Sequence, residues 1–471
     1  MRTVCNGEQL SFQALGKRAV VGRFDAGRTS SDGGVMLLRE TAMRTNLFEK
    51  VASCFVDYRN PLRVEFSVKE LVAQRILGLA CGYEDLNDHD TLRDDALFAL
   101  GAARQDVLGE KRQSHSDRGH ALAGKSTLNR LELTPADASG SSRYKKVVYD
   151  ASAFERMFVE HFIDVHESPP SQIILDLDAT DDLLHGRQEG RFFHGYYGEY
   201  CSLPLYIFCG EFLLVAKLRT SDRDGSDGAL EEVTRLVHQI RARWPEVEIV
   251  LRADSGFARE PLMAFCEAQT KVHYVFGLAK NARLNRAIGR AMHEANEAHK
   301  VSGKAERRFE DLEYRTKNTW SRPRRVVAKA ERIVLKDNPR FVVTSLPASR
   351  WDARALYEDV YCARGDMENR IKEQQLGLFA DRTSCHAMRA NQLRLWFSSL
   401  AYVLMNDLRR LGLANTELAS AQVWTIRNRL LKLATVVRVS VRRVVLSFSS
   451  VFVYQRVFER VFENLQRRCI A

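Results

Sequence analysis

The sequence predicts a mixed α/β protein in which a mostly helical N-terminal region precedes a five-stranded sheet flanked by helices. Two observations support this prediction. Residues 1–165 place their apolar side chains mainly at helical spacing, whereas from Ser171 onward short apolar runs alternate with amphipathic segments. The chain has 471 residues, of which 45% are hydrophobic and 28% charged. That composition excludes collagen-like, low-complexity and disordered classes and is sufficient for several units with buried cores.

Three helices and one loop are expected within residues 1–165. The segment Ser67–Leu79 has apolar residues three to four positions apart, as one face of a helix requires. Further helices are expected over Asp88–Ala102 and over Ser126–Leu133, which ends before Pro135. The polar stretch Gly109–His120 is expected to form a loop between them.

Five strands are expected between residues 171 and 280. The first is a short apolar run that ends in an acid, which is typical of a buried strand whose C-terminal end opens on a site. A hairpin follows, and then strands alternate with helices. In chain order the expected elements are strand Gln172–Asp178, strands Leu203–Phe208 and Phe212–Arg219, helix Asp227–Trp244, strand Val247–Ala253, helix Glu260–Gln269 and strand His273–Leu278.

This order of elements is that of an RNase H-like core, in which the first and fourth strands lie side by side and parallel. Asp178 and Asp254 would then end neighbouring parallel strands, so both carboxylates are expected at one sheet edge although 76 positions separate them. Two acids at one edge are costly unless a cation neutralises them. Asp176 lies on the same strand face and is the alternative ligand, whereas Asp181 and Asp182 are expected to be solvated turn acids.

Residues 281–350 are predicted to be a basic, partly β insertion, and residues 351–410 to complete the core with a helix over Arg354–Gln375. The insertion is expected to be helical over Ala282–His299 and β-like over Arg308–Thr316, Arg324–Leu335 and Phe341–Leu346. On the later helix, a stripe of polar residues recurs every three to four positions and so occupies one face. A solvated helix surface would show the same stripe, which consists of Tyr361, Arg364, Glu368, Lys372 and Gln375.

The net charge of +11 is concentrated in two segments. Residues 280–340 contain 17 Lys and Arg against 8 Asp and Glu, and residues 421–471 contain 10 against 2. Such patches are typical of contact with a phosphate backbone, although two solvated faces would give the same counts. In the first segment Trp320 could stack on a displaced base or pack in a core. In the basic region 411–471, a strand over Val437–Val441 would turn Arg438 and Arg442 outward, toward DNA or simply toward water.

Several classes of protein are not expected from the sequence. The stretch Gly119–Ser126 matches a phosphate-binding GxxxxGKS loop, but no apolar strand precedes it, so no nucleotide cofactor is expected. The nine cysteines are scattered without zinc-ligand spacing, which indicates free thiols in a reducing compartment. The N-terminus lacks the apolar segment of a secretory signal, and Ser398, Ser399 and Asn406 interrupt the apolar stretch Leu393–Leu408. We therefore expect a cytoplasmic, nucleoid-associated protein without a membrane partner.

Three motifs give the sequence a family resemblance. D-A-T at Asp178–Thr180, A-D-S-G at Ala253–Gly256 and Y-x-x-R-G-x-x-E-N at Tyr361–Asn369 resemble the cut-and-paste DDE transposases of bacterial insertion sequences. The likeness is greatest to the group with a Tyr-Arg-Glu-Lys signature, and the stretches 24–40, 122–132 and 194–211 extend it over nearly the whole chain. The signature lysine is replaced by Gln375, and Lys372, one turn earlier, could supply that cation.

The resemblance implies metal-dependent cleavage and joining of DNA strands at terminal inverted repeats. Two Mg²⁺ or Mn²⁺ ions would be held, with Asp178 bridging them and Asp254 and Glu368 each binding one. Arg364 would hold a phosphate and Tyr361 would position the strand. Water and then a 3′-hydroxyl would be the nucleophiles. The implied partners are double-stranded DNA, as terminal repeats and target, and a second copy of the chain in the DNA complex.

Two other functions remain open from the sequence. The first is a transposase-derived DNA-binding protein that no longer cleaves, because Gln375 replaces the signature lysine. The second is an ATPase acting on DNA through the stretch Gly119–Ser126. Intact acids at positions 178, 254 and 368 favour the active transposase over both.

Overall fold

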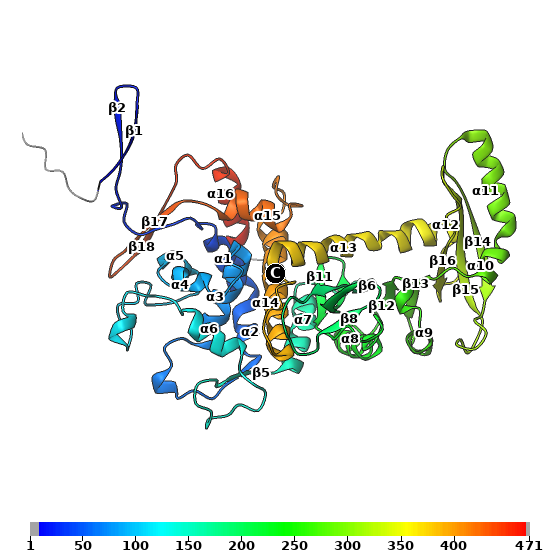
Figure 1. The fold of residues 1–471 in the computed structure, drawn as a ribbon, viewed down its shortest axis with the longest axis horizontal. Coiled ribbons are helices and arrows are strands. Elements are labelled where there is room, and N and C mark those ends of the chain that lie inside the picture. The colour runs from blue at the N-terminus through cyan, green and yellow to red at the C-terminus, as the bar shows by residue number, and fades with distance from the viewer. Residues whose placement is uncertain (1–8, 468–471) are drawn as a thin grey trace, which may run out of the picture.

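The computed structural model describes residues 9–467 and consists of a helical body joined to a long twisted sheet (Figure 1). The helical body contains α1–α7 with short strands between them. Its helices are α1 (Val35–Thr45), α2 (Leu47–Ala52), α3 (Val68–Cys81), α4 (Asp88–Leu92), α5 (Ala96–Gly101), α6 (Lys125–Glu132) and α7 (Ala151–Asp164). Its strands are β1 (Leu10–Leu15), β2 (Arg18–Gly22), β3 (Thr29–Ser30), β4 (Phe55–Asp57) and β5 (Val147–Tyr149).

Helix α3 begins and ends at residues whose chemistry defines helix termini. Ser67 accepts a hydrogen bond from the Glu70 N–H while the Glu70 carboxylate accepts one from the Ser67 N–H, so the two residues form a capping box. Gly82 ends the helix with φ of 96°, a conformation that glycine adopts without strain. The helix expected over Asp88–Ala102 is instead two helices, because the Asp95 carboxylate accepts the N–H groups of Leu97 and Phe98 and so starts α5.

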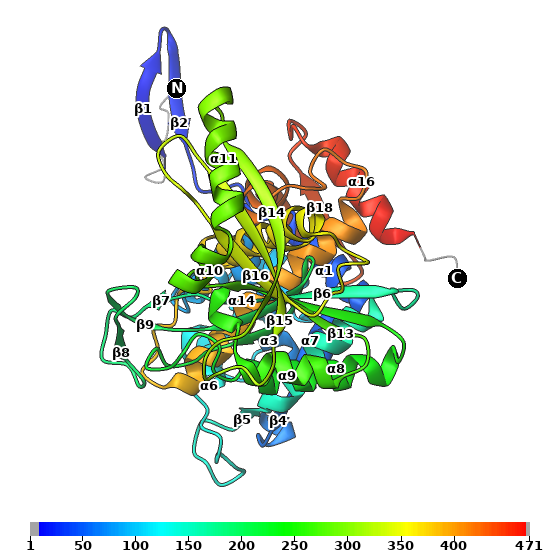
Figure 2. The same ribbon diagram turned by 90° about the vertical axis from the view of Figure 1, so that its right-hand side faces the viewer.

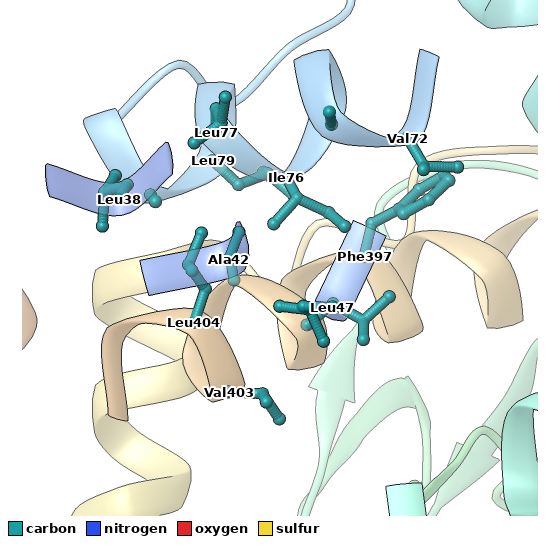
Figure 3. Packing of buried hydrophobic residues seen from close by; sticks show 14 of the residues in the cluster. Leu38, Ala42, Leu47, Val72, Ile76, Leu77, Leu79, Phe397, Val403 and Leu404 are labelled. Carbon is teal, nitrogen blue, oxygen red and sulfur yellow. The ribbon is translucent and has the colours of Figure 1, made fainter. Parts of the chain in front are cut away.

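Helix α14 (Met388–Asp407) forms the centre of the helical body. It is the apolar stretch recognised in the sequence, and it packs against α1, α3 and strand β11. Figure 3 shows Phe397 and Leu404 of this helix beside side chains of α1, α2 and α3, including Ala42, Leu47 and Val72. A helix apolar on all sides is expected where protein surrounds it. Among residues 9–467, none of the helices has the length and apolar character needed to cross a membrane.

The sheet has eight strands in the order β11-β10-β6-β12-β13-β16-β15-β14. Strand β6, the first strand of the predicted core, is parallel to its neighbour β12, with Leu177 opposite Ala253, as the sequence predicted. Figure 1 shows α8 and α9 on one face of the sheet and the helix containing α13 on the other. The strands are β6 (Gln172–Ala179), β10 (Leu205–Cys209), β11 (Phe212–Lys217), β12 (Glu248–Ala253), β13 (Val272–Leu278), β14 (Glu306–Tyr314), β15 (Arg324–Arg332) and β16 (Arg340–Thr344), with helices α8 (Ala229–Arg243) and α9 (Glu260–Ala268).

The prediction of a five-stranded sheet was wrong in extent. Strand β16 pairs antiparallel with β13, so the three strands expected in the insertion continue the sheet rather than forming a separate unit. The physical reason is that β13 would otherwise present an unpaired edge. The predicted helix at the start of the insertion divides at Ile288 into α10 (Ala282–Ala287) and α11 (Gly289–Ser302). Between β6 and β10 the chain forms a small three-stranded sheet of β7 (Asp182–Leu183), β8 (Phe192–His194) and β9 (Glu199–Ser202).

The helix predicted over Arg354–Gln375 forms, but its turns are irregular. It starts with α12 (Ala353–Ala355), continues through a wide π-helical turn over Leu356–Tyr361 and a tight 3₁₀ turn over Cys362–Arg364, and becomes regular in α13 (Gly365–Lys372). A second π-helical turn follows over Glu373–Gly377. Such turns shift the angular position of side chains, so the even spacing of the polar stripe does not hold along its whole length.

The C-terminal segment folds against the N-terminal one. It contains α15 (Val423–Ile426), β17 (Thr435–Val439), β18 (Val444–Phe448) and α16 (Gln455–Gln466), and β17 pairs with both β18 and β3. Next to this pairing, buried Asp32 accepts hydrogen bonds from Lys432 at 2.6 Å and from the Tyr83 hydroxyl at 2.7 Å. Residues near 30 and near 435 therefore belong to one body.

The stability of the extended sheet is expected to depend on Arg324, whose side chain is 2% exposed and pairs with Glu260 and Glu267 of α9 at 2.6 and 2.7 Å. Arg324→Ala leaves two carboxylates without their buried partner and should lower the free energy of unfolding by about 3–5 kcal/mol. Urea titration measures the effect. Arg322→Ala is the control, because Arg322 also pairs with Glu267 but is 58% exposed, and an equal loss there would contradict the expectation.

Candidate active site

Asp178 and Asp254 lie at the same edge of the sheet, one residue beyond the last register pair of β6 and β12. The pKa of Asp178 is raised to about 7, chiefly by burial; the Arg364 guanidinium opposes the rise, and the nearby Asp254 and Glu368 carboxylates contribute to it. One Asp254 oxygen accepts the Gly256 N–H at 2.8 Å and so caps a short 3₁₀ turn over Ser255–Phe257. Capping engages a single oxygen, so the same carboxylate can also serve a site.

Asp176 has a different role from Asp178. Arg252 of β12 donates to both Asp176 oxygens, from Nε at 2.5 Å and from Nη2 at 2.8 Å. The same guanidinium donates from Nη1 to the carbonyl oxygen of Val360 at 2.6 Å, and all of these groups are buried. Asp176 is therefore committed to an ion pair that fixes the helix onto the sheet, and of the two acids on this strand Asp178 is the one open to a ligand.

Arg364 connects the third acid to the sheet edge. Its Nη2 atom donates to Glu368 Oε1 at 2.6 Å, one turn further along the helix, and its Nη1 atom lies 3.6 Å from Asp178 Oδ1. The guanidinium thus lies between two of the three predicted ligands. This geometry brings Asp178, Arg364 and Glu368 together, as expected from the sequence. Each acid pairs with Arg364, which lies between them.

The donor chemistry of this edge fits divalent metal ions. Carboxylate oxygens are the hard ligands that Mg²⁺ and Mn²⁺ take. Burial is the main reason that the pKa of Asp178 is raised, and the nearby Asp254 and Glu368 carboxylates add to the rise. Within residues 9–467 no three His, Cys, Asp or Glu side chains are close enough together to hold a metal ion as they stand. The positive charge of Arg364 takes that neutralising place between Asp178 and Glu368.

Tyr361 packs at the start of the site against the backbone of β13. A Cβ atom added at Gly277 would lie 2.6 Å from the Tyr361 hydroxyl and 2.9 Å from the Ser255 nitrogen, so only glycine allows this close approach. Tyr361 and Asp254 line a common cavity of about 400 Å³. Burial raises the pKa of the Tyr361 hydroxyl, which keeps it protonated and able to donate a hydrogen bond near neutral pH.

Two cations of this cavity escaped the sequence analysis. Lys280 and Arg340 line it together with Asp254 and Tyr361, and neither forms an ion pair with any residue in the described part of the chain. They meet because Leu278 of β13 is opposite Phe341 of β16. Both residues belong to the basic segment 280–340, but the sequence contained no signal for the strand pairing that places them beside Asp254.

The last positions of the stripe leave the site. Gln375 donates to Asp182 Oδ1 at 2.8 Å and to the Asp181 carbonyl at 3.3 Å, so it anchors the helix to the turn after β6. Asp182 was expected to be solvated, but it is buried, and burial raises its pKa to about 8. Lys372 is exposed one turn after Glu368.

Three predictions outside the site have different outcomes. Trp320 is 5% exposed and packs edge-on against Tyr314 in the core, so its proposed stacking on a base is corrected. An indole has a large apolar surface, so its burial between neighbouring strands is favoured over its exposure to water. Arg438 and Arg442 are exposed, on β17 and in the turn after it. In the GxxxxGKS stretch, Lys125 donates from its backbone N–H to Asp90 at 2.9 Å and its ammonium pairs with the same carboxylate.

A model of the family described as "Transposase DDE domain group 1" matches residues 12–469. The chain belongs to this family. No curated protein matches it significantly. Among solved structures, a piggyBac transposase in a synaptic complex with hairpin DNA is similar at 12% identity and a TM-score of 0.41, over 86% of this chain and 81% of that one. The DDE transposase resemblance predicted from the sequence is thus confirmed, and the origin in a bacterial insertion sequence stays a prediction.

Asparagine substitutions should separate the two acids of β6 in this transposase. Asp176→Asn leaves Arg252 buried without its counter-charge and should lower the free energy of unfolding by about 3–5 kcal/mol. Asp178→Asn at pH 8 removes a carboxylate that is charged above its pKa of about 7 in a place where burial disfavours the charge. Its melting temperature should equal or exceed that of the unchanged protein. Equal destabilisation by both substitutions would contradict the assignment.

Proposed function

We propose that the protein is a DNA transposase that binds terminal inverted repeats and cleaves and joins DNA strands on an RNase H-like core. The strand order β11-β10-β6-β12-β13 supports that core. One observation carries the proposal. Asp178 and Asp254 end adjacent parallel strands, and Arg364 draws Glu368 to the same edge. No fold element other than these two strand ends and one helix is needed to gather the three acids.

Asp178, Asp254 and Glu368 would hold two Mg²⁺ or Mn²⁺ ions, with Asp178 shared between them. When bound, such ions activate the attacking oxygen and stabilise the leaving oxygen of a phosphodiester. Arg364 donates one hydrogen bond to Glu368, so Glu368 would become available to a metal once that guanidinium turned to another anion. A DNA phosphate is the natural alternative, because the planar fork of a guanidinium can bind a phosphate with two hydrogen bonds.

The remaining cations of the site would position the DNA. Lys280 and Arg340 lie on the Asp254 side, in the cavity that Tyr361 closes, and they suit a phosphate next to the one being cleaved. Arg364 and exposed Lys372 lie on the Glu368 side. Arg438 on β17 and Arg442 in the turn between β17 and β18 would contact the duplex further away. The partners would be terminal repeats and target DNA, handled by two copies of the chain.

A second candidate is a transposase-derived DNA-binding protein that does not cleave. Gln375 favours it, because its amide is bonded to Asp182 and brings no positive charge to the site. The two functions differ in one measurement: the active enzyme cuts a duplex that contains its element end when Mg²⁺ or Mn²⁺ is added, without ATP. A purified protein that binds the element end and leaves it intact in either ion would establish the second candidate.

Replacing the third acid should uncouple cleavage from binding. Glu368→Ala removes a predicted metal ligand from an exposed helix position, so cleavage should fall by at least about 10²-fold, the usual cost of losing one group that stabilises a transition state. DNA affinity measured by fluorescence anisotropy should fall by less than threefold. Asp366→Ala is the control, since Asp366 is an exposed acid two positions away on the same helix. Normal cutting by the Glu368 variant would refute its role.

Neutralising the cavity cations should change the salt dependence of DNA binding. A Lys280→Ala, Arg340→Ala double variant should lower the slope of log K against log salt by about 2, one for each lost phosphate contact. Lys336→Ala, in the exposed turn between β15 and β16, should leave the slope unchanged. A double variant with the parental slope would show that no phosphate enters this cavity.

A further inference from the structure

The β1–β2 hairpin stands away from the body of the protein. Figures 1 and 2 show it projecting from the helical end, and all residues of both strands except Gly22 are exposed. A two-stranded hairpin with no third partner is marginally stable in water. Residues 23–28 connect the hairpin to β3. Six extended residues span about 20 Å, so this connection allows the hairpin to reach a molecule other than its own chain.

One face of this hairpin is apolar. Paired residues of an antiparallel ladder point to the same side, and the register pairs Phe12 with Val20 and Leu15 with Arg18. With Leu10, two positions before Phe12, the face presents four apolar side chains and one arginine near the turn. Phe12 is 60% exposed and Leu15 is 72% exposed. Their burial against a partner would be favourable, because it removes apolar surface from water.

A complementary groove lies elsewhere on the molecule, between α1, β18 and α16. Its volume is about 470 Å³, which is enough for several apolar side chains, and its walls are mainly apolar and include four phenylalanines. Two of the wall residues, Phe448 and Phe462, are themselves exposed. Two acids stand among these apolar residues, Glu40 and Glu459, and Glu459 accepts a hydrogen bond from Gln455 but pairs with no cation of residues 9–467.

We propose that the hairpin of one copy docks in this groove of a second copy. The apolar face would cover the apolar walls, and the cations at the hairpin turn, Lys17 and Arg18, would meet Glu40 and Glu459. Because each copy has one hairpin and one groove, reciprocal docking makes a closed two-fold dimer and leaves neither surface open. The exposed face also selects protein over DNA as the partner, since apolar side chains gain nothing from a phosphate backbone. The inference does not depend on cleavage activity.

The dimer is tested first with the full-length protein in the absence of DNA. Analytical ultracentrifugation should show a dimer whose dissociation constant rises at least tenfold in a Phe12→Ser, Val20→Ser variant. The control is Val334→Ser, Leu335→Ser, which changes two exposed apolar residues in the turn between β15 and β16. A parental protein that is monomeric at every soluble concentration, or equal dimerisation by the hairpin variant, would overturn the proposal.

Charge exchange tests the specific contact. Arg18→Glu and Glu459→Arg should each weaken the dimer, and the combined variant should recover most of the affinity because the pair is restored with reversed sign. Failure of the combined variant to recover would contradict a contact between these residues. If the hairpin variants instead lose affinity for DNA while the dimer persists, the hairpin contacts DNA and the proposal is wrong.

Disulfide trapping distinguishes a second copy from the same chain. In a background with Cys5, Cys362 and Cys469 replaced by serine, differently tagged Phe12→Cys and Phe462→Cys proteins are mixed and oxidised. A disulfide-linked species that contains both tags is expected, and Val334→Cys in place of Phe12→Cys should give none. A chain with both Phe12→Cys and Phe462→Cys that forms only the intramolecular disulfide would overturn docking between copies.

Discussion

The arrangement of the site depends on the buried guanidinium of Arg252. It neutralises Asp176 on the neighbouring strand and, through a third hydrogen bond, holds the carbonyl of Val360 in the π-helical turn that ends at Tyr361. One side chain thus connects β6, β12 and the helix that carries the third acid. A buried charge is tolerated only when it is paired and its donors are satisfied, so the position of this helix is set by the requirement to satisfy Arg252.

The edge of the sheet is then a place where negative charge exceeds positive charge. Arg252 neutralises Asp176, whereas Asp178 and Glu368 share the guanidinium of Arg364. Asp254 lines the cavity that Lys280 and Arg340 also line. The pKa of Asp178 is raised chiefly by burial, and the carboxylates of Asp254 and Glu368 add to the rise while Arg364 opposes it. Under the proposed function, Arg364 is the residue whose movement would exchange the protein's own cation for a metal ion.

The rest of the molecule consists of a packed body, in which the helices and the sheet are joined, and the β1–β2 hairpin, which projects from it. Helix α14 joins the helical body to the sheet through β11, and the contact of β17 with β3 joins the two ends of the chain. The sheet continues from β13 into β16, β15 and β14, which brings Lys280 and Arg340 to the active-site side of that junction. The hairpin β1–β2 remains outside both cores, with an apolar face that a single copy leaves in water.

The sequence by itself determined the elements of the core and the acids at its edge, because strand and helix periods are local and because adjacent parallel strands end at one edge. The sequence thus predicted Asp178 and Asp254 at one edge and Arg364 one helical turn before Glu368, and the roles of these residues stay predictions. Tertiary structure alone decided the rest. Trp320 is buried, Gln375 faces Asp182 rather than the site, and Lys280 meets Arg340, because long-range strand pairing and π-helical turns depend on distant residues that no local pattern encodes.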